Sequence, residues 1–217
     1  MPPTRSLTWL FDLDNTLHNA SHAIFPHINL AMRQYIERHL GLSTPEADAV
    51  RQRYWERYGA TLLGLVRHHQ TDPAHFLAAT HDFPDLASLL RFDPALRHAL
   101  ARLPGKKIIF SNAPRAYTKA VLQLTGLRHF FSAIYTVEDT RLQPKPLLGG
   151  FRRLLAKERL QARRCVLVED TLANLVAAKR LGMKTVWITG GRKNARAVDV
   201  RLTSCRNLPR EFRQLRL

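Results

Sequence analysis

The chain contains four short apolar runs, and each of them ends at polar or turn-forming residues. They cover residues 7–11, 108–110, 166–168 and 186–188. Each run is rich in β-branched or aromatic residues, a pattern that predicts short buried strands. Because the runs are almost continuously apolar, we expect strands covered on both faces, as in a parallel sheet.

Amphipathic segments separate the later strands. Apolar residues at helical spacing predict helices over residues 114–124, 147–155 and 171–181. Gly126 and Gly182 follow the first and third segments, where glycine commonly ends a helix, whereas Gly149 and Gly150 weaken the start of the second. Strands that alternate with helices predict an α/β fold with a doubly wound, Rossmann-like parallel sheet.

The stretch from residue 15 to about residue 90 has a different pattern, because it lacks strand-like runs. It predicts several helices, including residues 24–39, 44–57 and 73–80, with Pro45 and Pro73 in tolerated first-turn positions. Asp93-Pro94 then predicts a further helix before the second strand. We therefore expect a catalytic core of residues 1–17 and 91–217, with a helical module of residues 18–90 inserted after the first strand.

Length and composition agree with a globular protein of one core and one inserted module. The chain has 217 residues, of which 45% are hydrophobic. No apolar run approaches the ~20 residues of a membrane span, and the first apolar stretch is too short for a signal peptide, so we expect a cytoplasmic protein without membrane contact. Cys165 and Cys205 are too few for a disulfide framework and are expected to be inert thiols.

Charge is the unusual feature of the composition. Lys and Arg total 34 against 17 acidic residues, a formal net charge of +17. Such a balance attracts anions, including phosphorylated small molecules and nucleic acids. The basic residues are spread along the chain, with denser stretches at residues 141–164 and 192–216. We prefer the interpretation of a solvated basic surface over that of a nucleic-acid partner.

Polar side chains that could take part in catalysis or metal binding stand directly after three of the predicted strands. Asp12 and Asp14 follow the first, Ser111 and Asn112 the second, and Glu169-Asp170 the third. Open α/β sheets bind ligands outside the carboxyl ends of their strands, so we expect these groups to converge there. Clustered carboxylates repel one another unless a cation joins them, and hard oxygen ligands suit Mg²⁺.

A magnesium site of this kind favours phosphate chemistry. Asp12 is a candidate nucleophile that forms an acyl phosphate, and Asp14 a candidate acid and base. Ser111 offers a hydroxyl for phosphate, and Lys145, restrained between two prolines, offers a cation.

Each of these signals has an ordinary structural alternative. The two aspartates could form an acidic turn, Ser111 and Glu169-Asp170 could cap helices, and Lys145 could be a surface lysine. Their order along the chain and their shared position at strand ends favour the functional interpretation.

Four motifs in this order resemble those of the haloacid dehalogenase-like superfamily of phosphohydrolases. They are Phe11-Asp12-Leu13-Asp14-Asn15-Thr16-Leu17, Ile109-Phe110-Ser111-Asn112, Lys145 within Gln143-Pro144-Lys145-Pro146, and Val168-Glu169-Asp170 followed by Asn174. The resemblance covers nearly the whole chain. The inserted helical stretch resembles the α-helical cap of one subgroup of this superfamily.

The resemblance implies a role for each matching residue. Asp12 would attack phosphorus, and Asp14 would protonate the leaving oxygen and then activate water. Ser111, Asn112 and Lys145 would hold the phosphoryl group. The metal Mg²⁺ would be bound by the Asp12 carboxylate, the Asp14 backbone carbonyl and Asp170, with Glu169 nearby or acting through water. Dehalogenases lack an aspartate at the position of Asp14, so the resemblance favours phosphoryl transfer.

Further phrases resemble the pyrimidine 5′-nucleotidase branch, which implies UMP or CMP as substrate. They occupy residues 58–65, 68–72, 81–82, 103–113 and 177–186. Glu169, where this branch often has aspartate, and residues 148–150 depart from its pattern. The candidate contacts to base or sugar are Tyr58, Thr61, His68 and Arg115. Packing of Tyr58 within the cap and a solvated surface for His68 and Arg115 are the alternatives.

Three other functions stay open at this point. A phosphomutase or a phosphatase of small sugar phosphates would use the same catalytic set. A nucleic-acid-binding protein on the same fold would account for the charge, but the intact catalytic set argues against it. The expected partner is therefore a small phosphorylated metabolite, and the sequence predicts no oligomeric state.

Overall fold

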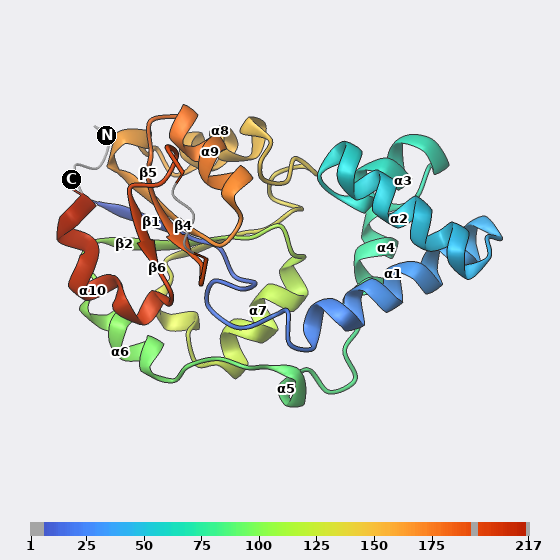
Figure 1. The fold of residues 1–217 in the computed structure, drawn as a ribbon, viewed down its shortest axis with the longest axis horizontal. Helices are drawn as coiled ribbons and strands as arrows, with labels where there is room; N and C mark the ends of the chain where they lie inside the picture. The colour runs from blue at the N-terminus through green and yellow to red at the C-terminus, as the bar shows by residue number, and fades with distance from the viewer. Residues whose placement is uncertain (1–6, 192–194, 216–217) are drawn as a thin grey trace. The chain divides into compact units, whose positions relative to one another are not determined.

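The computed structural model describes residues 7–191 and 195–215, and the chain divides into two compact units (Figure 1). The α/β unit comprises Met1–Asn19 and Arg91–Leu217, and the helical unit comprises Ala20–Leu90. The predicted role of the helical segment as a cap over a catalytic core stays a prediction.

A six-stranded parallel sheet forms the centre of the α/β unit. Its strands are β1 (Thr8–Phe11), β2 (Lys106–Phe110), β3 (Ala133–Tyr135), β4 (Cys165–Glu169), β5 (Lys184–Ile188) and β6 (Val200–Leu202). The strand order is β3-β2-β1-β4-β5-β6, with every neighbouring pair parallel. The chain therefore builds outward from β1 to β3 and then returns to β4 on the other side of β1. This order confirms the predicted doubly wound fold and places its switch point between β1 and β4.

The two outermost strands are the ones that the hydrophobic pattern missed. The four predicted strands correspond to β1, β2, β4 and β5, whereas β3 and β6 have three residues each. Both lie at the edges of the sheet, where natural strands are often short. A run of three residues is too short to establish a periodicity, so only the pairing with a neighbour identifies these strands.

Helices cover both faces of the sheet. They are α6 (Ala95–Arg102), α7 (Arg115–Leu124), α8 (Leu148–Lys157), α9 (Leu172–Arg180) and α10 (Leu208–Glu211). Figure 1 shows α8 and α9 on one side and α6, α7 and α10 on the other. The alternation of side chains along strands supplies both cores: Phe110 meets Phe151 of α8 edge to face at 5.0 Å, whereas Phe11 meets Phe131 at 5.8 Å.

The helical unit is built from α1 (Ile24–Leu40), α2 (Thr44–Tyr58), α3 (Thr61–His69), α4 (Pro73–Thr80) and the short α5 (Leu86–Leu89). A capping box between Ser43 and Glu46 starts α2, and the Asp72 side chain caps α4. Close packing of α2 on α3 depends on Gly64, because a Cβ there would lie 2.2 Å from the Tyr54 ring. The helices predicted for this segment are confirmed, and α3 and α5 are additional.

The positive charge is distributed unevenly between the two units. The helical unit contains six arginines, no lysine and seven acidic residues, so all of the excess positive charge belongs to the α/β unit. Among the described residues, no helix combines the length and apolar character that a membrane crossing requires. Cys165 and Cys205 are free and buried, and burial raises the pKa of both thiols, that of Cys165 to about 12.

Candidate active site

The carboxyl ends of three strands bring the predicted site residues of the α/β unit together. Asp12 directly follows β1 and donates its backbone N–H to Val168 of β4 at 3.0 Å. Ser111 follows β2 and donates its backbone N–H to Tyr135 of β3. Glu169 is the last residue of β4. These groups lie around the switch point of the sheet, where doubly wound folds bind their ligands.

Lys145 links two of these strand ends. Its ammonium donates to Asp12 Oδ1 at 2.7 Å and to Glu169 Oε2 at 2.6 Å. The residue is only 2% exposed, and its peptide bond to Pro146 is cis. The alternative interpretation of Lys145 as a surface lysine is therefore wrong.

The position of Lys145 is set by the side chain of Asn112. The Asn112 amide donates to the Lys145 carbonyl at 2.9 Å and accepts the Lys145 backbone N–H at 2.8 Å. Asn112 thus holds the loop that carries the lysine, and its predicted contact with phosphate stays a prediction. The Ser111 hydroxyl accepts the Ala113 N–H at 3.0 Å. Because the N-cap of α7 is Pro114 without a side-chain cap, the interpretation of Ser111 as the helix cap is wrong.

Three carboxylates form a group that suits a metal ion. One oxygen from each of Asp12, Glu169 and Asp170 lies within 4.8 Å of the others. The Glu169 carboxylate also accepts the N–H groups of Asp170 and Thr171, both at 3.1 Å, so it is oriented by the start of α9. An all-oxygen, anionic donor set is what Mg²⁺ prefers, and these residues fit the predicted ion.

Electrostatics at this cluster also favour a cation. Burial, and then the charges of Glu169 and Asp14, raise the pKa of Asp12 from 3.8 to about 7, although Lys145 opposes the shift. Burial likewise raises the pKa values of Glu169 and Asp170. Burial alone would lower the pKa of Lys145, but Asp12 and Glu169 raise it overall. One ammonium faces three carboxylates, so a divalent ion would relieve the remaining repulsion.

Asp14 lies beyond a tight turn and has its own partners. Asn15 adopts φ of 58°, a left-handed conformation that asparagine tolerates, and turns the chain after Asp14. Asp14 Oδ1 accepts the Tyr117 hydroxyl at 2.6 Å and lies 2.9 Å from His18 Nε2. Burial and the neighbouring Asp14 raise the pKa of Tyr117, so the phenol remains a donor.

Neither His18 nor Tyr117 is among the site residues that the sequence predicts. His18 follows Asp14 by four positions, and Tyr117 stands in the first turn of α7, after Ser111 and Asn112. Neither position carries a local signal of chemistry, because the contact with Asp14 exists only once α7 packs beside the loop that follows β1.

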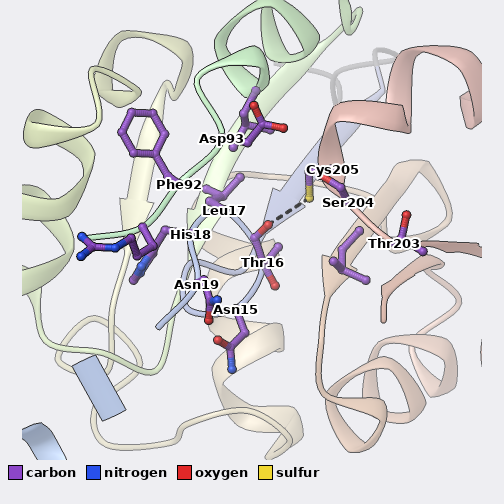
Figure 2. Close-up of a pocket in the computed structure, with 13 residues that line it drawn as sticks. Asn15, Thr16, Leu17, His18, Asn19, Phe92, Asp93, Thr203, Ser204 and Cys205 are labelled. Carbon is purple, nitrogen blue, oxygen red and sulfur yellow. Dashed lines mark hydrogen bonds between the residues drawn. The ribbon is translucent and has the colours of Figure 1, made fainter. Parts of the chain in front are cut away.

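A pocket of about 410 Å³ lies against the loop from Asn15 to Asn19 (Figure 2). Its other walls come from residues 91–93 and 203–205, together with Leu96 and Ile188. Cys205 Sγ donates to the Thr16 carbonyl at 3.3 Å, the contact drawn as a dashed line in Figure 2. None of the clustered carboxylates Asp12, Glu169 and Asp170 lines this pocket.

The four predicted substrate contacts are distributed over both units. In the helical unit, the Tyr58 hydroxyl lies 2.6 Å from His68 Nε2, and the buried Thr61 donates to the Arg51 carbonyl at 3.0 Å. In the α/β unit, Arg115 begins α7 and pairs with Asp139 at 2.5 Å. Contact of these residues with a base or sugar stays a prediction.

Comparisons with known proteins identify the family of the chain. A sequence profile described as a haloacid dehalogenase-like hydrolase matches residues 8–182. The chain is 23% identical over 195 residues to Phosphate metabolism protein 8 of Saccharomyces cerevisiae, covering 83% of this chain but only 60% of the yeast protein. It is 24% identical over 188 residues to the Validoxylamine A 7′-phosphate phosphatase of Streptomyces hygroscopicus subsp. limoneus, covering 83% and 84% of the two chains.

A solved structure shares the fold over almost its full length. The HAD phosphatase from Thermococcus onnurineus superimposes with a TM-score of 0.68 at 23% identity, covering 95% of this chain and 97% of that one. At this identity the superposition supports the fold, whereas the profile match over most of the sequence identifies the family. The chain belongs to the haloacid dehalogenase-like hydrolases.

Proposed function

We propose that this protein is a magnesium-dependent phosphatase of small phosphomonoesters, with Asp12 as nucleophile and residues 20–90 as a cap over the core. The observation that carries the proposal is the buried Lys145 ammonium, which joins Asp12 to Glu169 beside Asp170. Lys145 thus lies between a candidate nucleophile and a group of carboxylates that suits a metal ion. A lysine ammonium and a metal ion together can neutralise the negative charge of a phosphoryl group.

In the first step, an oxygen of the Asp12 carboxylate attacks phosphorus and the bond from phosphorus to the ester oxygen breaks. The carboxyl group of Asp14 gives its proton to the departing oxygen, and the alcohol leaves. The product on the protein is an acyl phosphate at Asp12. Lys145 and Ser111 bind phosphoryl oxygens and hold the group in line for the attack.

In the second step, a water molecule attacks the same phosphorus. Asp14, now a carboxylate, takes a proton from the water, and the bond between phosphorus and Asp12 breaks. Inorganic phosphate is released, and both aspartates return to their initial protonation states, so the cycle balances.

The metal site completes the arrangement. Asp12, Asp170 and the backbone carbonyl of Asp14 would hold Mg²⁺, with Glu169 oriented beside them. Bound there, the ion supplies neutralisation of the charge on the phosphoryl oxygens.

The substrate class is small phosphorylated metabolites, and UMP and CMP are the members that we propose to test first. This choice is supported by the nucleotidase-like sequence phrases at residues 58–65 and 103–113. One relative is named Validoxylamine A 7′-phosphate phosphatase, so phosphorylated small molecules other than nucleotides, such as sugar phosphates, are the competing substrates. The cytoplasm is the compartment in which we expect the protein to act.

Phosphate release from 4-nitrophenyl phosphate in the presence of Mg²⁺ tests the reaction. Asp12→Asn should abolish release, because a carboxamide is a poor nucleophile, whereas Asp48→Asn, at a partly exposed position of the helical unit, should retain it. Full activity of Asp12→Asn would overturn the mechanism. A screen of nucleoside monophosphates and sugar phosphates then tests the substrate, and a clear preference for a sugar phosphate would remove UMP and CMP while leaving the chemistry intact.

A further inference from the structure

We infer that Tyr117 and His18 are positioning residues that orient Asp14 for proton transfer to the leaving group. The inference deepens the proposed phosphatase function and rests on it. Its basis is the convergence of two hydrogen bonds on one oxygen: the Tyr117 hydroxyl lies 2.6 Å and His18 Nε2 lies 2.9 Å from Asp14 Oδ1. The Tyr117 hydroxyl and His18 Nε2 are themselves 3.3 Å apart, so the three groups form a closed triangle.

The tautomer of His18 follows from its surroundings. Within the described part of the chain, His18 Nδ1 is buried and has no hydrogen-bond partner. A proton on Nδ1 would bury an unpaired donor and would turn the lone pair of Nε2 toward the Asp14 oxygen, and both arrangements are unfavourable. We therefore assign the proton to Nε2, which makes His18 a second donor to Asp14 Oδ1.

Both donors are held rigidly and come from different elements. Tyr117 is 3% exposed and belongs to α7, whereas His18 is 5% exposed and belongs to the loop after β1. The Asp14 side chain itself remains partly exposed, at 16%. Two buried rings thus fix one carboxyl oxygen and restrict rotation of the group.

This arrangement distinguishes the two oxygens of Asp14. The hydrogen bonds found for its carboxyl group among the described residues all use Oδ1. Oδ2 is consequently the oxygen that presents the proton to the ester oxygen, and its direction is set by the contacts to Oδ1. Fixed orientation of a proton donor lowers the barrier only when the leaving group needs the proton, which gives the inference a specific signature.

The structure also offers a matched control. Tyr135 is another tyrosine that is 3% exposed in the same unit, and its hydroxyl donates to the Glu158 carboxylate at 2.8 Å. Tyr135→Phe and Tyr117→Phe therefore delete the same hydroxyl from the same kind of hydrogen bond. Of these two tyrosines, only Tyr117 contacts Asp14, the proposed general acid.

The test compares kcat/KM for two aryl phosphates of similar shape, 4-nitrophenyl phosphate and 4-methylphenyl phosphate, with Mg²⁺ present. The nitrophenol leaves readily without a proton, whereas the methylphenol depends on one. Tyr117→Phe should reduce kcat/KM for the methylphenyl ester by roughly 10- to 100-fold and for the nitrophenyl ester by no more than about 3-fold. Tyr135→Phe should leave the ratio of the two substrates at its wild-type value. An equal loss on both esters, or no loss in Tyr117→Phe, would overturn the inference.

A second pair of variants decides the matter if Tyr117→Phe does not fold. Gln at position 18 can place an N–H near the position of Nε2, whereas Leu cannot. His18→Gln should keep a substrate ratio closer to wild type than His18→Leu does, and identical ratios for the two would contradict the inference. Failure of the wild-type protein to release phosphate from either ester would instead contradict the proposed function, so the two failures are distinguishable.

Discussion

The ammonium of Lys145 lies 2.7 Å from Asp12 Oδ1, although 133 residues separate the two in the chain. The same ammonium reaches Glu169 Oε2 at 2.6 Å, and both carboxylates are buried. A single buried cation therefore compensates two buried anions, and Asp170 adds a third close by. The stability of the site, its pH dependence and its response to metal all depend on this charge balance.

Removal of the ammonium should destabilise the fold as well as abolish catalysis. In Lys145→Met, the Asp12 and Glu169 carboxylates lose their partner while they stay buried, so we expect a loss of about 3–5 kcal/mol in the free energy of unfolding at pH 8. Urea denaturation followed by circular dichroism measures this loss. Lys106→Met is the matched control, because the Lys106 pair with Glu158 is more exposed and should contribute about 1 kcal/mol or less. Equal effects of the two substitutions would contradict this account.

The two hydrogen bonds between the Asn112 side chain and the Lys145 backbone lead to a separate prediction. Asn112→Ala removes two hydrogen bonds to that backbone, so the free energy of unfolding should fall by about 1–3 kcal/mol. The rate of phosphate release should fall about tenfold or more. Asn29→Ala, which removes an exposed side-chain contact to Arg51, should change stability by less than about 0.5 kcal/mol. An Asn112→Ala protein with the wild-type urea midpoint would show that these two hydrogen bonds do not contribute to stability.

The raised pKa of Asp12 predicts how stability depends on pH in the absence of metal. The folded protein holds the Asp12 proton up to about pH 7, whereas the ordinary value for an unfolded chain is 3.8. The folded state therefore binds this proton more tightly, and its stability falls as the pH rises from about 4 to about 7. Asp12→Asn cannot titrate, so the free energy of unfolding of the wild type relative to this variant should decrease across that interval. If the free energies of unfolding of the two proteins, measured with EDTA present, depended on pH in the same way, the raised pKa of Asp12 would be contradicted.

Metal binding should be visible without any turnover. At neutral pH, Mg²⁺ at about 100 times its dissociation constant should stabilise the folded protein by about 2.7 kcal/mol, which corresponds to a rise of roughly 5–10 °C in melting temperature. Differential scanning fluorimetry measures the rise, and EDTA should reverse it. Asp170→Asn should remove most of the shift, whereas Asp199→Asn, whose carboxylate binds Lys179 and Thr185 instead, should retain it. The same magnesium shift in both variants would place the ion elsewhere.

Local pattern was enough to predict much of the architecture. The apolar runs that became β1, β2, β4 and β5 are recognisable because burial on both faces demands continuous hydrophobicity over a few residues. The position of Asp12 after the first run and of Asp170 after the third implied that the two would meet, since parallel strands end at a common edge. Tyr135 illustrates the limit, because its strand β3 is only three residues long and exists through pairing with β2.

The sequence by itself therefore determined the fold class, the central strands and the acidic residues at their ends, because each of these follows from the hydrophobicity and chemistry of neighbouring residues. Only the tertiary structure decided that Lys145 is buried between Asp12 and Glu169, that Asn112 holds its backbone, and that Tyr117 and His18 converge on Asp14. The physical reason is distance along the chain. Most of these contacts join residues that are many positions apart, and their geometry arises when helices pack on the sheet.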